Sequence, residues 1–174
     1  MSLSRKLIVH VLLVLMLFVG VSSAAAAPTA DHQVVNETIS PFTIPADQCP
    51  RLPAGVSVTG TGERHMVVNT DTKADGTTEV RTNDLVTGVA TDSNGGVHKF
   101  VYHNSSTLTI PPSGDYSINM NDTFDLSGPG PHFSVSFNWR WTFPSLELLW
   151  PPSGDNWEQL HGNPDDIFLC DPLK

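Results

Sequence analysis

The side chains best suited to chemistry in this sequence are histidines and carboxylates, and they are scattered along the chain. After His10 come six further histidines: His32, His65, His98, His103, His132 and His161. Strand alternation puts Glu63 and His65 on one face, and His132 begins the polar face of another strand. These three are weak candidates for a two-histidine, one-carboxylate metal site. No H-x-H, HExxH or helically spaced histidine pair supports it, so we expect scattered histidines, no metal and no cofactor.

The sequence also lacks a recognisable catalytic motif. No G-x-S-x-G elbow is present, and Ser134 and Ser136 alternate as solvent-facing strand residues do. Spacing along the chain cannot measure the distance between two carboxylates, so glycosidase chemistry has no support. The acidic turns Asp71–Gly76 and Asp92–Gly96 do not complete a calcium-binding loop. We therefore assign no catalytic residue, and no motif specifies a substrate or a reaction.

The strongest pattern in the chain is the stretch HFSVSFNWRWTF at His132–Phe143. Apolar and polar residues alternate along its whole length, which predicts a β-strand with one buried face and one wet face. Arg140 lies on the wet face beside Asn138 and Thr142. Its guanidinium could bind a carboxylate or the polar end of a ligand, although a solvated strand charge explains it as well.

The ring-bearing face of this strand has two interpretations. It is most simply part of the core, but in a wide barrel the same rings could line a pocket for an apolar ligand. The candidate ligand-binding residues are therefore Phe137, Trp139, Trp141, Arg140, Tyr102 and His132.

The rest of the chain also reads as strands separated by turns. Pro41 should bend the first strand, Asn83-Asp84 should break the third, and Asn94-Gly95 predicts a type I′ hairpin. Ser145–Trp150 could form one helical turn. The expected strands are 34–44, 56–69, 77–91, 97–103, 106–110, 116–126 and 133–143.

This pattern predicts an all-β domain, which we expect to be a small antiparallel β-barrel, with a β-sandwich as the alternative. Gly60 and Gly62 suggest the bends that a closing barrel requires. A disordered leader at 28–33 should precede a single domain at 34–174. Cys49 and Cys170 form an even pair that predicts a disulfide tying an irregular C-terminal tail to the body.

The N-terminus predicts export. Arg5 and Lys6, an apolar run at Leu7–Val21 and small residues at Ser22–Ala27 match a secretory signal peptide over residues 1–27. The remaining chain has seven basic and eighteen acidic residues, a formal net charge of −11. That balance argues against nucleic-acid binding, and no later segment is apolar enough to enter a membrane.

Three stretches carry a resemblance: GTGERHMVVNTD at 60–71, DSNGGVHKFVYHNSSTL at 92–108 and LSGPGPHFSVSFNWRWTF at 126–143. Together they resemble a group of uncharacterised secreted bacterial proteins of the actinomycete type, a resemblance that spans Cys49 to Cys170. It implies export and a β fold, and it carries no catalytic residue across. The layout is also similar to calycin-like and allene-oxide-cyclase-like barrels, as an analogy of architecture.

These observations lead to one expected function and two alternatives. We expect an exported, non-enzymatic β-barrel that binds a small, partly apolar ligand or a component of the cell envelope. The alternatives are a secreted protein-interaction module with an unknown partner, and a barrel enzyme that uses histidines and acidic residues.

Overall fold

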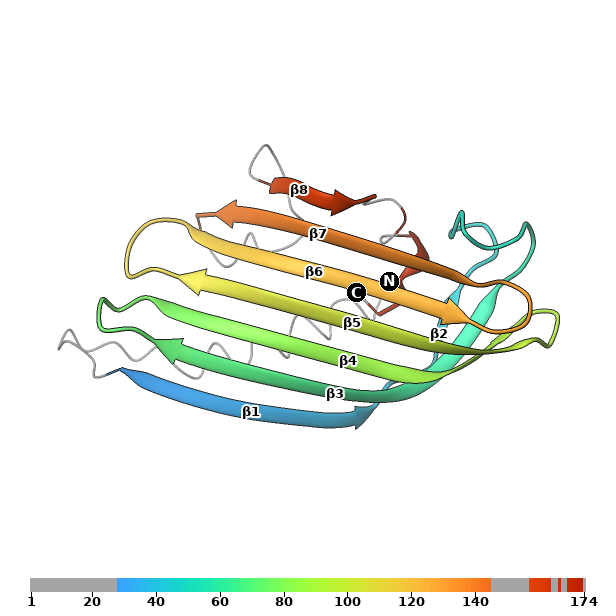
Figure 1. Cartoon of the computed structure of the whole chain (residues 1–174), viewed down its shortest axis with the longest axis horizontal. Coiled ribbons are helices and arrows are strands. Elements are labelled where there is room, and N and C mark those ends of the chain that lie inside the picture. The colour runs from blue at the N-terminus through green and yellow to red at the C-terminus, as the bar shows by residue number, and fades with distance from the viewer. Residues whose placement is uncertain (1–27, 145–156, 164–165, 167–168, 174) are drawn as a thin grey trace.

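The computed structural model describes residues 28–144, 157–163, 166 and 169–173, and these residues form one antiparallel β-sheet of eight strands (Figure 1). The strand order is β1-β3-β4-β5-β6-β7-β8, and β2 pairs with the beginning of β3. Most neighbours along the sheet are also neighbours in sequence, so short turns connect the central strands. The strands are β1 (Thr29–Thr38), β2 (Phe42–Ile44), β3 (Val58–Thr72), β4 (Thr78–Asp92), β5 (Val97–Ile110), β6 (Tyr116–Ser127), β7 (Phe133–Phe143) and β8 (Trp157–Gly162).

The prediction of an all-β antiparallel domain is confirmed, but the prediction of a barrel is wrong. The sheet is open, with β1 at one edge and β8 at the other. The sandwich alternative is wrong too, because the described residues form a single sheet. The strand glycines serve packing instead of closure: a Cβ on Gly60 would lie 2.6 Å from the Phe42 ring, and one on Gly88 would lie 2.6 Å from the Phe100 ring.

Alternation along the strands gives the sheet an inner face, which holds the core, and an outer face, which meets solvent. The inner face consists of even-numbered residues of β3 to β6 and odd-numbered residues of β7. The predicted ring set of β7 points inward, with Phe137 and Trp141 each 2 % exposed. Phe100 and Phe124 stack at 5.9 Å in the centre of this face, and Phe42 meets Phe100 edge-on at 5.0 Å.

Four local predictions differ from the structure. The strands expected at 97–103 and 106–110 are one, since β5 runs without interruption from Val97 to Ile110. The expected leader at 28–33 is mostly strand, because Thr29–Thr38 pairs along its whole length with β3. The expected break at Asn83-Asp84 is absent, since β4 runs without interruption from Thr78 to Asp92. The Asn94-Gly95 hairpin exists, but only Gly95 has a positive φ, so the turn is type I followed by a left-handed glycine instead of type I′.

The predicted disulfide is confirmed. Cys49 and Cys170 are bonded with their Cα atoms 4.6 Å apart, and both side chains are buried. The bond joins the segment before β3 to the C-terminal segment, so it holds the two ends of the domain together. The predicted signal peptide and the predicted helical turn at Ser145–Trp150 lie outside the described residues. Within the described part of the chain, we find no helix of the length and apolarity needed to span a bilayer.

We expect a Cys49→Ser, Cys170→Ser double variant to lose about 4 kcal/mol of unfolding free energy, because the bond closes a loop of 121 residues and so restricts the unfolded chain. Urea unfolding of the oxidised native chain and of the variant measures the difference. Equal midpoints and slopes for the two proteins would contradict a stabilising role for this bond.

Candidate functional site

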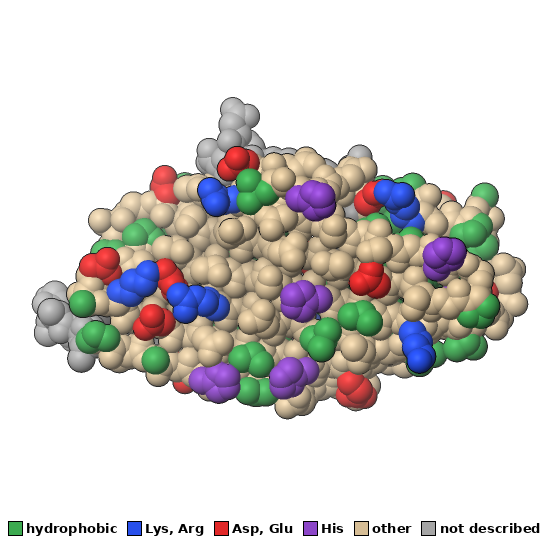
Figure 2. All heavy atoms as spheres, viewed as in Figure 1, with side chains coloured by type: hydrophobic (Ala, Val, Ile, Leu, Met, Phe, Trp, Pro, Cys, Tyr) green, Lys and Arg blue, Asp and Glu red, His purple; other side chains and the backbone are tan. Residues whose placement is uncertain are grey.

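The outer face of the sheet carries rows of uncharged hydroxyl and amide side chains that cross from strand to strand. The pairing registers of β4 to β7 align Asn83, Ser105, Asn121 and Asn138 in one such row. In Figure 2 backbone and side chains that are neither charged, histidine nor hydrophobic cover most of the centre of the face, with histidines and hydrophobic residues dispersed among them. Such a row offers donors and acceptors at the strand spacing of about 4.8 Å.

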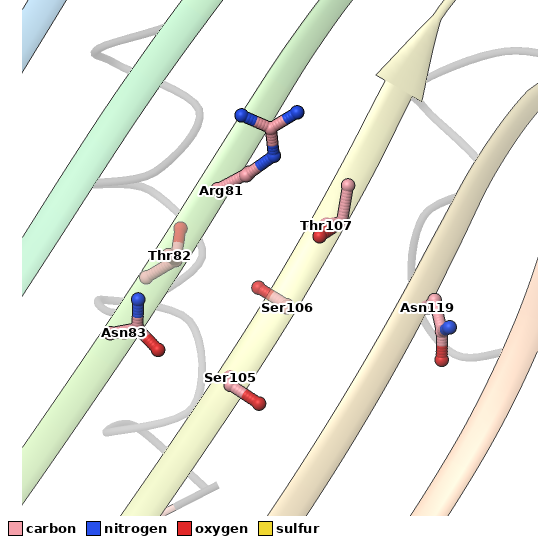
Figure 3. Close-up of a pocket in the computed structure, with 7 residues that line it drawn as sticks. All are labelled: Arg81, Thr82, Asn83, Ser105, Ser106, Thr107 and Asn119. Carbon is pink, nitrogen blue, oxygen red and sulfur yellow. The ribbon is translucent and has the colours of Figure 1, made fainter.

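A shallow hollow of about 210 Å³ lies on this face across three neighbouring strands, β4, β5 and β6 (Figure 3). The side chains that alternation directs to the outer face are one guanidinium (Arg81), two hydroxyls (Ser105 and Thr107) and two amides (Asn83 and Asn119), whereas Thr82 and Ser106 belong by alternation to the inner face. None of the seven lining residues is aromatic. The lining residues are Arg81, Thr82, Asn83, Ser105, Ser106, Thr107 and Asn119.

The single charge at the hollow is already balanced. Arg81 forms an ion pair with Glu79, which also pairs with Lys73. The hydrogen bond from Lys73, together with the charges of Lys73 and Arg81, lowers the pKa of Glu79 below its ordinary value. The hollow therefore presents a nearly neutral, hydrogen-bonding surface to a ligand.

A second guanidinium lies farther along the same face. The row through the hollow runs from Arg81 to Thr107, Asn119 and Arg140, and it spans about 14 Å because three strand spacings separate its ends. Arg140 is exposed, and within the described residues it forms no ion pair, although Glu158 of β8 lies opposite it in register. Arg140 is thus free to meet a ligand that extends from the hollow toward β7.

An apolar patch occupies the other half of the outer face of β4 and β5. It consists of Leu85, Val89, Val97 and Val101, which are 40 %, 52 %, 57 % and 39 % exposed. The hollow and the patch lie on the same two strands, at opposite ends of their pairing. In this half each aliphatic side chain lies opposite a polar one, since Leu85 pairs with His103, Val89 with Lys99, Val101 with Thr87 and Val97 with Thr91. The outer face therefore has a polar half and a half in which apolar and polar side chains alternate.

The structure separates the predicted ligand-binding residues into three places. Phe137, Trp139 and Trp141 lie in the core of the inner face, at most 5 % exposed, and Tyr102 is buried there too. Arg140 lies on the outer face. His132 belongs to the turn between β6 and β7, where its Nδ1 donates to the carbonyl of Gly130 at 3.3 Å. The set is therefore not one site.

The weak metal candidates are not brought together either. Glu63 and His65 share the outer face of β3, while three strands separate them from His132. His65 donates to Asn36 Oδ1 at 2.7 Å, and Thr38 donates to Glu63 at 2.9 Å. No group of three or more histidine, cysteine or acidic residues in the described ranges is placed to hold a metal ion.

A row of polar side chains that strand alternation alone does not explain crosses the inner face. Asp84, Asn104 and Asp122 lie opposite one another on β4, β5 and β6, and each is at most 8 % exposed. Tyr102 hydrogen-bonds to Asp122, and burial, together with the neighbouring carboxylates, raises the pKa of Tyr102 well above its ordinary value. This row lies within a core whose buried apolar residues form one continuous cluster on both sides of it.

An ionic triad connects this row to the edge of the sheet. Arg64 of β3 is 7 % exposed and lies 3.2 Å from Asp84 and 2.9 Å from Glu37 of β1. Burial raises the pKa of Asp84 above its ordinary value, and the charge of Arg64 opposes that shift without reversing it. The triad therefore holds three strands together at the cost of a buried carboxylate.

A second buried pair fixes the turn between β4 and β5. Asp92 accepts hydrogen bonds from the backbone N–H groups of Asn94 and Gly96 at 2.8 and 2.9 Å, and from His98 Nε2 at 2.8 Å. The hydrogen bond from His98, followed by that from Gly96, lowers the pKa of Asp92. A Cβ on Gly128 would lie 2.9 Å from the His98 ring, so the turn after β6 packs directly against this pair.

Sequence reasoning did not single out the hollow or the polar row, although strand parity contained part of the signal. Asn119 and Asn121 belong to the wet face of their predicted strand. Asp122 breaks the apolar face of that strand, which is the signature of a buried carboxylate with a partner. The predicted break at Asn83-Asp84 hid the equivalent signal on β4.

The chain gives no significant match to any protein-family model, any curated protein or any solved structure. The fold defines a protein with one open antiparallel sheet, a disulfide that joins its N-terminal and C-terminal segments, and a mostly polar outer face.

The raised pKa of Asp84 predicts a pH dependence of stability with a definite sign. The folded state binds this proton more tightly than the unfolded state, so the contribution of Asp84 is complete below the ordinary carboxyl pKa of about 4. It is lost as the pH rises through the raised value. We expect the unfolding free energy of the native chain to fall, relative to that of an Asp84→Asn variant, as the pH rises above the ordinary carboxyl pKa of about 4 and through the raised pKa of Asp84.

Urea unfolding at a series of pH values measures this difference. Asp125→Asn, on the outer face of β6, is the matched control and should run parallel to the native chain. The interpretation fails if Asp84→Asn and the native chain show parallel pH profiles.

Proposed function

We propose that this chain is an exported, non-enzymatic binding module that holds a hydroxyl-rich ligand, such as a glycan of the cell envelope, on the outer face of its sheet. The observation that carries the proposal is the hollow of about 210 Å³, lined by hydroxyl and amide groups from three adjacent strands. Sugar hydroxyls both donate and accept hydrogen bonds, and the hydroxyl and amide groups of the lining can accept from them and donate to them. The disulfide and the charge of the chain agree with a role outside the cytoplasm.

The geometry favours an extended ligand over a compact one. The hollow is open, and the polar row continues beyond it to Asn138 and Arg140 on β7. Asn138 continues the row of amides onto β7, although its Oδ1 is buried and accepts no hydrogen bond from the described chain. A polymer that crosses the strands would meet a new donor or acceptor at each strand.

The aromatic rings on the inner face are buried in mutual contact, which leaves no space for a ligand among them. Trp139 and Trp141 pack against each other with ring centroids 6.2 Å apart, and Trp141 lies 4.7 Å from Phe143. Rings in mutual contact stabilise the fold, and a ligand would have to displace them. Binding an apolar ligand among these rings would cost their packing, whereas binding a polar ligand on the outer face would not.

Affinity electrophoresis in gels that contain soluble polysaccharides tests this function. We expect a neutral glucan or a carboxylated galacturonan to retard the native chain. The double variant Asn119→Ala, Ser105→Ala should bind about tenfold more weakly, because each lost hydrogen bond contributes about 0.5–1.5 kcal/mol. Thr91→Ala, an exposed residue of β4 outside the hollow, is the matched control. Equal retardation of the double variant and the native chain would place the ligand elsewhere, and no retardation by any polysaccharide would refute the proposal.

The apolar patch supports a second candidate, a protein-interaction module. Four branched aliphatic side chains exposed together on β4 and β5 are a suitable centre for a protein interface. Binding of a protein partner by the native chain and by Asn119→Ala, but not by Val89→Asp or Val101→Asp, would favour this candidate. The reverse pattern would favour the glycan.

A further inference from the structure

We propose that β1 pairs with β1 of a second copy of this chain, in antiparallel orientation, and so joins two sheets edge to edge. β1 is the outermost strand of the sheet and lies along its border in Figure 1. All ten of its residues pair with β3 on one side, and within the described residues its other side has no strand partner. Eight of the ten are exposed, and only Gln33 and Val35 are half-buried.

This edge lacks the features that protect an exposed edge strand. The sequence TADHQVVNET contains no lysine, proline or glycine, and its pairing with β3 has no register shift. Its carboxylates are engaged locally, since Glu37 pairs with Arg64 and Asp31 accepts a hydrogen bond from Gln33. The edge therefore offers a row of backbone N–H and C=O groups to another strand.

The continuation of the same edge is blocked. β2 follows β1 along the border of the sheet, but it has three residues and lies between Pro41 and Pro45. Proline has no N–H to donate to a neighbouring strand, so the pairing surface is confined to Thr29–Thr38.

The asymmetry of the two edges identifies the occupant as another copy of the same strand. At the opposite edge β8 has six residues, faces only Phe137–Trp141 of β7, and is interrupted by a register shift at Asn138/Trp139. Short and irregular edges pair poorly. Of the two edges in the described sheet, only that of β1 is long and regular, so the pairing joins β1 to β1 about a two-fold axis, and the assembly closes at two copies instead of growing into a filament.

Charge limits the register of this pairing. Centring the two-fold axis on Val34 would place Asp31 opposite Glu37, and like charges directly opposite each other are destabilising. Centring it on Val35 places Val34 opposite Asn36 and Gln33 opposite Glu37, which brings no like charges together. Both outer faces then lie on the same side of the joined sheet. The pairing does not depend on the proposed function, but it would let one polymer engage two hollows.

Sedimentation equilibrium over a range of concentrations tests the pairing, with Val34→Lys as the informative variant. Val34 is 47 % exposed, and a lysine on an edge strand opposes strand addition. The matched control is Thr91→Lys, because Thr91 is exposed on β4, an interior strand, and belongs neither to the hollow nor to the apolar patch. We expect the native chain and Thr91→Lys to reach the mass of two chains, with Val34→Lys remaining at one.

Amide hydrogen exchange supplies a second readout that does not rest on the variants. In the native chain, Thr29–Thr38 should become more protected as concentration increases, while the amides of β4 should not change. A native chain with the mass of one copy at every concentration would overturn the proposal. So would equal dissociation by Val34→Lys and Thr91→Lys, or protection of β1 that is independent of concentration.

Discussion

The alternation of side chains along long, in-register antiparallel strands is the constraint on which the rest of this structure depends. Once Phe137, Trp139 and Trp141 point inward, every second residue of β7 must point outward, and pairing extends that choice to β6, β5, β4 and β3. A slip of one residue in a single pair would exchange the two faces of a strand and expose its rings to water. The polar outer face is thus a consequence of the way in which the core is buried.

The core contains a polar row that costs stability and defines the arrangement of the strands. A buried Asp84 is unfavourable as a charge, and Arg64 compensates it only in part. Arg64 lies on β3, so a shifted β3–β4 register would leave the carboxylate without this partner. The Asp92–His98 pair fixes the register of the β4–β5 hairpin in the same manner, through hydrogen bonds to its own turn. Buried polar groups of this kind select one pairing among several that the apolar residues would tolerate.

The sequence predicted the strands more successfully than their assembly. Period-two alternation over His132–Phe143 identified β7 (Phe133–Phe143) to within one residue, and the two cysteines identified the disulfide. Closure into a barrel was not predictable from Gly60 and Gly62, because a strand glycine permits either a bend or the close approach of a ring, and here the Phe42 ring occupies that space. The Asp84 position was misread for a related reason: an aspartate within a strand resembles a turn unless its partner on another strand is known.

The candidate site was predictable only in its chemistry. Arg140 and the amides beside it could be assigned to a wet face from alternation alone. The hollow could not, because Asn83, Ser105 and Asn119 come from three strands and meet through a register that no local spacing reveals.

The measurement that tests the central claim most directly is an NMR titration of the native chain with a soluble glucan oligosaccharide, following side-chain amide and indole N–H resonances together. The account predicts shifts at the amides of Asn83 and Asn119 and unchanged indole resonances for Trp139 and Trp141. Shifted indoles with unchanged asparagine amides would contradict it and place the ligand within the core face.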